Sequence, residues 1–174
     1  RKVAATSLLR AFGISSDEEI KKLFVEIDSH PDIKYIDATL AKDVAQNQSE
    51  GLMEVYKRIR PGDLATPENA KSLIFAMFFN FERYDFGQVG RYKMNQRFGN
   101  EYQLIEEHRV LKVDDLVAVI KEIIRLSITQ SDADDIDHLG NRRIRAIGEL
   151  IQNRFRIGLA SMTRIIKDRM STID

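Results

Sequence analysis

The stretch NRRIRAIGELIQNRFRIGLASMTRIIKDRM, from Asn141 to Met170, contains the longest regular pattern in the sequence. Its apolar residues recur every three or four positions, which is the spacing of one face of an α-helix. They are Ile144, Ile147, Ile151, Phe155, Leu159, Met162 and Ile166. The pattern predicts one long helix over residues 141–170.

Two clear helix starts lie upstream, at Ser16 and Thr66. Ser16-x-x-Glu19 has the form of a capping box, in which hydroxyl and carboxylate each satisfy a free backbone N–H. Thr66 precedes a proline and a glutamate, which suit the first turn of a helix. The apolar spacing behind these caps predicts two buried faces, made of Ile20, Leu23, Phe24 and Ile27, and of Leu73, Ile74, Met77 and Phe78.

The remaining segments suggest two more amphipathic helices and a little strand. One helix carries Leu52, Val55, Tyr56 and Ile59 and ends at Arg60-Pro61-Gly62. The other starts at Asp114. Its residues expected to face inward are Leu116, Val117, Ile120, Ile123, Ile124 and Ile128. Ile33–Leu40 (IKYIDATL) is rich in β-forming residues and predicts a strand or a pair of strands. The expected fold class is mainly α with minor strand content: a partial domain of amphipathic helices followed by one long helix.

Aromatic residues and arginines gather between Phe79 and Gly99, where we expect a turn followed by a short helix. Such aromatic rings can stack on unpaired nucleic-acid bases. They are more often part of a hydrophobic core, which is the favoured interpretation for Phe78 and Phe79. The residues in question are Phe78, Phe79, Phe81, Tyr84, Phe86 and Tyr92.

The composition excludes several classes of protein. The 174 residues are 43% apolar and 31% charged, which is ordinary for a globular domain. There is no cysteine, so disulfide scaffolds, thiolate metal sites and cysteine nucleophiles are excluded. No apolar run approaches the roughly 20 residues that span a bilayer, and we expect no membrane partner.

The formal net charge of zero conceals an asymmetry along the chain. From Asn141 onward there are eight basic and three acidic side chains. This part therefore carries a net charge of +5, and the first 140 residues carry −5. A concentrated positive charge can meet a polyanion, although a solvated helix face is the simpler explanation. The basic residues are Arg142, Arg143, Arg145, Arg154, Arg156, Arg164, Lys167 and Arg169.

The densest polar cluster precedes these arginines and contains Asp132, Asp134, Asp135, Asp137 and His138. Carboxylates and imidazole are metal ligands, but this spacing matches neither a calcium loop nor a zinc motif. Acidic residues that pair with nearby arginines at a helix start explain the cluster better. We therefore expect no metal site here.

Long stretches of the sequence resemble the β subunit of bacterial RNA polymerase. DDIDHLGNRRIRAIGELIQNRFRIGLASMTRIIKDRMS, from Asp134 to Ser171, resembles a signature stretch of that family. Arg1–Ile20, Tyr56–Asp85 and Val89–Phe98 resemble β-subunit segments in the same order. The resemblance covers nearly the whole chain and is weakest between Glu26 and Ser49. It agrees with a chain that starts at Arg1, which favours a piece of a longer protein.

The resemblance implies a position within a large enzyme that transcribes DNA into RNA. Residues 1–140 are implied to be the second half of the β lobe, and 141–174 a long helix leading into the protrusion domain. The family's catalytic Mg²⁺ is held by the β′ subunit, so no catalytic residue and no cofactor are expected in this fragment. The implied partners are the α, β′ and ω subunits, sigma factor and promoter DNA, in the cytoplasm at the nucleoid.

The resemblance also implies which residues contact DNA. Residues matching Ile136, Asp137 and Arg142 line a pocket for an unstacked guanine of the non-template strand. Arg60, Arg83 and Arg145 are implied to face the single strand upstream of that pocket. The alternative for Arg60 and Arg83 is pairing with local acids such as Asp63 or Asp85.

Two other functions remain open from the residues. The chain could be a docking module for sigma factor or another transcription regulator, with the exposed face of the helix after Thr66 and the acidic first half as the binding surface. It could also be a metal-dependent hydrolase that uses Asp135, Asp137 and His138, which requires a bound metal.

Overall fold

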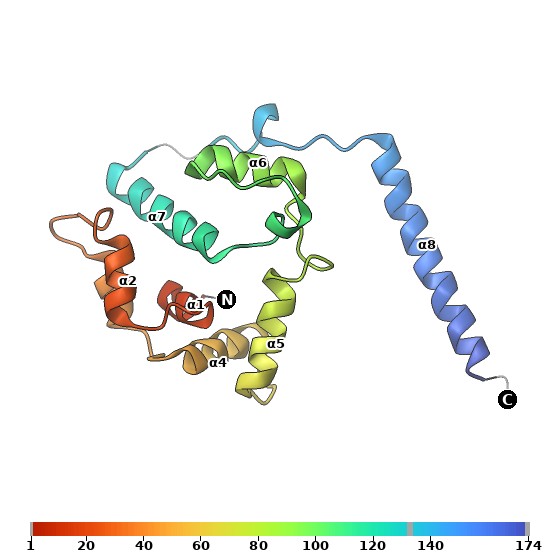
Figure 1. Ribbon diagram of the computed structural model, residues 1–174, viewed down its shortest axis with the longest axis horizontal. Coiled ribbons are helices and arrows are strands. Elements are labelled where there is room, and N and C mark those ends of the chain that lie inside the picture. Colours follow the sequence, from red (N-terminus) through yellow and green to blue (C-terminus); the bar gives the residue numbers. More distant parts are fainter. Residues whose placement is uncertain (1, 132–133, 173–174) are drawn as a thin grey trace. The chain divides into compact units, whose positions relative to one another are not determined.

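The computed structural model describes residues 2–131 and 134–172, and every regular element within them is a helix (Figure 1). The prediction of a mainly α fold is therefore confirmed. The chain divides into two compact units, Arg1–Ser131 and Asp132–Asp174. The first contains α1 (Ala5–Ala11), α2 (Asp17–Phe24), α3 (Tyr35–Leu40), α4 (Gln48–Ile59), α5 (Pro67–Phe78), α6 (Gly87–Phe98), the 3₁₀ turn η1 (Glu106–His108) and α7 (Val113–Thr129). The second contains the 3₁₀ turn η2 (Leu139–Asn141) and α8 (Ile147–Met170).

Both helix starts that the sequence marks are confirmed. The Ser16 hydroxyl accepts a hydrogen bond from the Glu19 backbone N–H at 3.2 Å. Thr66 caps α5 in the same way, accepting from Asn69 at 3.3 Å, with proline at the first helical position. Each cap satisfies an N–H that the helix itself leaves unpaired.

The strand predicted over Ile33–Leu40 is wrong, because Tyr35–Leu40 is the helix α3. The carboxylate of Asp28 accepts the backbone N–H groups of Tyr35 and Ile36 at 3.0 and 2.9 Å. These are the first two N–H groups of α3, so a distant side chain supplies the cap that the local sequence lacks. Ile36 is buried in the core, and this tertiary contact overrides the local β preference.

The helix α1 lies among the other helices of the first unit and contacts α3, α4 and α7 (Figure 1). Two groups of buried apolar residues meet at it. Leu9 belongs to the first core, with Ile14, Ile20, Phe24, Ile36, Val117, Ile120 and Ile124. Ala11 belongs to the second, with Leu52, Val55, Tyr56, Ala70 and Ile74.

The inward faces predicted for the helices of the first unit are largely confirmed, but Ile59 on α4, which is 38% exposed, and Ile123 on α7 are exceptions. Ile123 was expected to face inward, but its side chain is 57% exposed. The buried apolar positions of α7 are Val117, Ile120 and Ile124, which follow one another at helical spacing. Ile123 lies beside this stripe and reaches solvent.

A buried ion pair joins α6 to α7. The side chains of Arg91 and Asp115 are both 0% exposed, and Arg91 Nη1 lies 2.7 and 2.8 Å from the two carboxylate oxygens. Arg91 also donates to the backbone carbonyls of His108 and Val110. Asp115 in turn accepts the N–H of Lys112 at 2.9 Å, next to the start of α7. The loop that contains η1 is thus tied to both helices.

The buried carboxylate of Asp43 holds α1 against the loop before α4. It accepts hydrogen bonds from the hydroxyls of Thr6 at 2.5 Å and Ser7 at 2.6 Å, and from the Ala45 N–H at 3.0 Å. Its side chain is 1% exposed, and Arg10 lies 3.7 Å away. Burial alone would raise the pKa of Asp43, but these hydrogen bonds outweigh burial and lower it below its ordinary value.

The lowered pKa of Asp43 predicts a pH-dependent contribution to stability. Asp43→Asn is expected to cost about 1–2 kcal/mol of unfolding free energy at pH 7, because the buried donors lose a charged acceptor. A carboxyl with a lowered folded pKa stabilises the fold above its unfolded pKa, and this contribution is lost as pH falls. Urea unfolding at several pH values should therefore show the gap between the two proteins narrowing below about pH 4. A gap that is constant from pH 7 to pH 3 would contradict the prediction.

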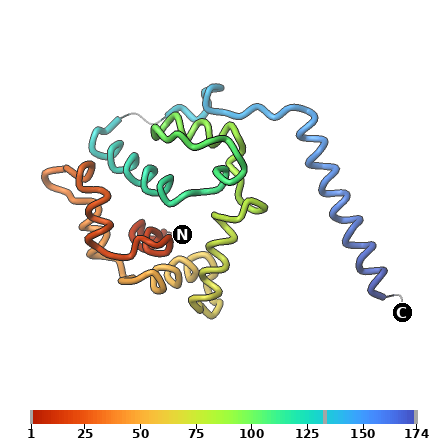
Figure 2. Tube along the Cα trace, viewed as in Figure 1, coloured from red at the N-terminus to blue at the C-terminus, as the bar shows by residue number. Residues whose placement is uncertain are grey.

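In the second unit α8 runs as one continuous helix (Figure 2). Its end at Met170 is as predicted, but it begins at Ile147 and not at Asn141. Residues 142–146 lie outside any helix, and Arg142 and Ala146 both have extended backbone angles. Among the described residues no helix is apolar over enough length to cross a membrane.

Candidate nucleic-acid interface

Asp137 and Arg142 form a charged corner at the surface of the second unit. Arg142 Nη1 lies 3.8 Å from Asp137 Oδ1, and the side chains are 62% and 93% exposed. At this distance the ion pair is loose, and exposed pairs of this kind add little to stability. Both groups therefore keep most of their hydrogen-bonding capacity for a ligand.

A tight turn holds the two residues of the corner near each other. The Asn141 side-chain amide donates to the backbone carbonyl of Asp135 at 2.7 Å. The Asp135 carboxylate accepts the N–H of Asp137 at 2.9 Å, which fixes the start of the turn. His138 Nδ1 accepts the N–H of Gly140 at 3.0 Å, so this nitrogen is already engaged. The turn positions the backbone, while the charged side chains stay in solvent.

The sequence led us to expect a helix N-terminus directly beside this corner, and that expectation is wrong. Five extended or irregular residues separate Asn141 from α8, which starts at Ile147. The apolar period continues through Ile144, but this residue is 81% exposed and lies before the start of α8. The helix dipole acts only within the first turn, so it contributes little at Arg142.

The two other residues proposed for this unit are also exposed. Ile136 is 81% exposed and is the immediate neighbour of Asp137 in sequence. Arg145 is exposed, and its positive charge, after the hydrogen bonds from Arg143, also helps to lower the pKa of Glu149. Arg143, between them in sequence, is instead bound to Glu149 in α8 at 2.8 and 2.5 Å.

Arg60 and Arg83 lie together in the first unit. Both line one hollow of about 400 Å³, which is also lined by Tyr56, Asn69, Ser72, Leu73 and Ala76. Arg60 follows the end of α4, and Arg83 lies in the turn after α5. Residues 23 positions apart thus place two positive charges around one polar cavity.

The alternative of local pairing is weak for both arginines. Arg60 Nη1 is 3.9 Å from Asp63, and both side chains are 56% exposed. Asp85, the other expected partner, is occupied by Arg109, whose Nε and Nη2 donate to it at 2.9 and 2.5 Å. The hydrogen bonds from Arg109 lower the pKa of Asp85. Both Arg60 and Arg83 therefore remain available to an anion.

Most of the aromatic residues contact groups within the protein. Phe78 and Phe79 pack on Phe12 with ring centroids 5.6 and 5.0 Å apart, which confirms the core interpretation for these two. Tyr84 packs edge-on against Phe86, which faces the Arg91 guanidinium at 5.0 Å. Phe81 faces Arg109 at 5.1 Å. Tyr92 is the exposed member of the set, at 54%.

The acidic cluster contains carboxylates and an imidazole, which are possible metal ligands. Asp132 lies outside the described residues. Among the described residues no group of three or more His, Asp or Glu side chains is arranged to hold a metal ion.

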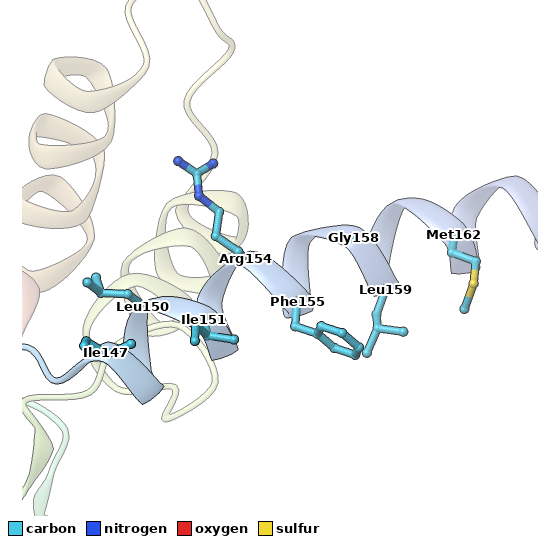
Figure 3. A pocket seen from close by; sticks show the side chains of 8 residues that line it. All are labelled: Ile147, Leu150, Ile151, Arg154, Phe155, Gly158, Leu159 and Met162. Atoms are coloured by element: carbon cyan, nitrogen blue, oxygen red, sulfur yellow. The ribbon is translucent and has the colours of Figure 1, made fainter.

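An apolar row runs along α8 (Figure 3). The row lines a shallow groove of about 560 Å³, and Arg154 is the charged residue at its edge. No side chain of α8 is buried within the described chain. The apolar members are Ile147, Leu150, Ile151, Phe155, Leu159 and Met162.

Sequence reasoning did not single out the pair of Arg143 and Glu149. The two residues are six positions apart, which is not the spacing of an ion pair within a helix. The pair forms because the chain turns from an extended segment into α8. Only the position of the helix start could have revealed it.

The family RNA polymerase Rpb2, domain 2, matches residues 1–145. This chain belongs to that family, whose members are parts of RNA polymerases. It is 45% identical over 175 residues to the DNA-directed RNA polymerase subunit beta of Dehalococcoides mccartyi. The corresponding subunits of Syntrophomonas wolfei and Streptomyces coelicolor are 44% and 41% identical to it.

The alignments cover 100% of this chain but only 14 to 15% of these relatives. The chain thus spans about a seventh of the length of these relatives. The resemblance to the bacterial β subunit that the sequence suggested is confirmed along its whole length.

Proposed function

We propose that this chain is the non-catalytic lobe part of the β subunit of a DNA-dependent RNA polymerase, where it walls the main channel and contacts the non-template strand. Residues 1–140 form the partial lobe and 141–174 lead into the protrusion domain. The subunit works with α, β′, ω and sigma factor on promoter DNA at the nucleoid. The catalytic Mg²⁺ of such an enzyme is held by β′. Membership of the family and the exposed pair Asp137 and Arg142 support this proposal.

The chemistry of the corner suits an unpaired guanine. A carboxylate accepts hydrogen bonds from N1–H and N2–H₂ of guanine, an edge that is free only when the base is unpaired. A guanidinium donates to O6 or N7, or to a phosphate. Asp137 and Arg142 supply these two groups side by side, and Ile136 adds an apolar surface next to them.

Replacing Asp137 by alanine in the whole polymerase is expected to reduce the preference for guanine by about 1–3 kcal/mol, the size of one good base contact. The measurement compares the lifetimes of promoter complexes that differ only in the base at the pocket position. An equal loss for all four bases would contradict the pocket, because a base contact must discriminate.

Arg60 and Arg83 are expected to bind phosphates without reading bases. Replacing either by alanine should weaken binding to all sequences alike and reduce the salt slope of log K by about 0.7 for each single-strand phosphate that is no longer neutralised. Arg58, on the same helix as Arg60, donates to Glu54 at 3.2 Å and is the matched control. An unchanged slope in the Arg60 and Arg83 variants would count against this role.

A second candidate function is docking of sigma factor or another regulator. Two exposed apolar side chains on and beside α5 favour it: Leu64 is 84% exposed and Phe75 is 59% exposed. Titration of the chain with sigma factor and with single-stranded DNA separates the two functions. Loss of sigma binding in Phe75→Ala, with DNA binding retained, would support docking.

A further inference from the structure

Arg143, in the extended segment before α8, forms a bidentate ion pair with Glu149. Arg143 Nη1 donates to Glu149 Oε2 at 2.8 Å, and Nη2 donates to Oε1 at 2.5 Å. Two parallel hydrogen bonds fix the plane of a guanidinium as well as its position. They lower the pKa of Glu149 and raise that of Arg143, so both groups are charged at neutral pH.

The pair connects the extended segment to the first turn of α8. Glu149 is the third residue of this helix, and Ala146 before it offers no side chain to cap the helix. At the start of α8 the Arg143 side chain therefore links the preceding segment to the helix. The starts of α2 and α5 are instead capped by the hydroxyls of Ser16 and Thr66. The path of residues 143–146 is set by this contact.

The position of Arg142 follows from this constraint. Arg142 has extended backbone angles, with φ −108° and ψ 133°. In extended chain successive side chains point to opposite sides. With Arg143 held toward α8, Arg142 faces the other way, and its Nη1 lies 3.8 Å from Asp137. The bond from Asn141 to Asp135 fixes the other end of the same short segment.

We propose that Arg143 and Glu149 are a positioning pair, which holds Arg142 beside Asp137 and does not itself contact DNA. This inference rests on the proposed reading of guanine by Asp137 and Arg142. Three arginines within four residues then have different tasks. Arg142 reads the base and Arg143 positions Arg142. Arg145 is exposed and acts on Glu149 only through its charge, so its guanidinium can bind a phosphate.

A double-mutant cycle in the assembled polymerase tests the proposal. Arg143→Ala and Glu149→Ala are each expected to reduce the guanine preference about two- to tenfold, as coupled neighbours do. The double variant should lose no more than the larger single loss, because the same ion pair is removed in every case. The salt slope should stay unchanged in all three. Promoter-complex lifetimes with guanine or thymine at the pocket position, at several salt concentrations, give both quantities.

Two further variants complete the experiment. Arg145→Ala should reduce the salt slope and retain the guanine preference, the reverse of the positioning pair. Arg156→Ala, on the exposed surface of α8, should change neither. If Glu149→Ala fails to assemble, the isosteric Glu149→Gln variant carries the test and should also lose guanine preference.

The possible results separate this inference from the proposed function. A reduced salt slope in Arg143→Ala, or losses that add in the double variant, would mean that Arg143 binds DNA directly and would overturn the inference. Full guanine preference in both single variants, with loss in Asp137→Ala, would overturn the positioning role and leave the pocket standing. Full preference in Asp137→Ala as well would overturn both.

Discussion

Asp115→Ala is expected to lower the unfolding free energy of the chain by about 3–5 kcal/mol, because it leaves the Arg91 guanidinium buried without a counter-charge. Both side chains are 0% exposed, so water cannot replace the lost carboxylate. The backbone N–H of Lys112 also loses its acceptor at the start of α7. Urea unfolding followed by circular dichroism measures the loss.

An exposed pair on α4 is the control for this prediction. Arg58 donates to Glu54 at 3.2 Å, and the Arg58 side chain is 53% exposed. Glu54→Ala is expected to cost under about 1 kcal/mol, as surface pairs do. Similar losses in Asp115→Ala and Glu54→Ala would show that burial of the first pair adds nothing.

Gly51→Val is expected to cost about 3 kcal/mol, at the upper end of the range for overpacked cores. A Cβ at Gly51 would lie 2.8 Å from the backbone oxygen of Ser7 and 3.0 Å from the backbone nitrogen of Ala11. Both atoms belong to α1, so α1 and α4 would have to move apart. Neither atom can move as the end of a flexible side chain would.

Gly158, in α8, is the matched control. A Cβ there meets no atom within 4 Å, so Gly158→Val should not lower the unfolding free energy. The Gly51 variant should also unfold at lower urea concentration with a similar slope. Equal stability of Gly51→Val and the unchanged chain would mean that α1 and α4 do not approach as closely as described.

The sequence predicted those helices whose ends are marked by local chemistry. Ser16 and Thr66 cap their helices through hydroxyls three residues from the N–H that they bind, so the signal lies within four positions. The long apolar period of α8 likewise gave its end correctly. Its start was placed six residues too early because Ile144 continues the period without being helical.

Features that depend on distant residues could not be predicted in this way. The helix α3 is capped by Asp28, seven residues before Tyr35, and its local sequence favours a strand. Arg91 and Asp115 are 24 positions apart, and no pattern in the sequence marks either as buried. The seven-residue helix α1 was not predicted, since it is too short for an apolar period and has no side-chain cap.

The candidate site shows the same division. The adjacency of Asp137 and Arg142 was expected from the resemblance, and the structure places them 3.8 Å apart. The cavity shared by Arg60 and Arg83 was not expected, because it forms only when α4 and α5 pack together. The sequence marks Glu149 only as an acidic residue, although its carboxylate binds Arg143 in the segment that carries Arg142.

The short helix α1 also determines how the first unit should melt. An isolated helix of seven residues is not stable in water, so α1 is ordered only while its neighbours hold it. Leu9 and Ala11 lie in separate cores, two positions apart on this one helix. If either core is lost, α1 unfolds. The other core then loses the α1 residue that it contains. Residues 2–131 should therefore melt cooperatively in a single calorimetric transition, with no half-folded species.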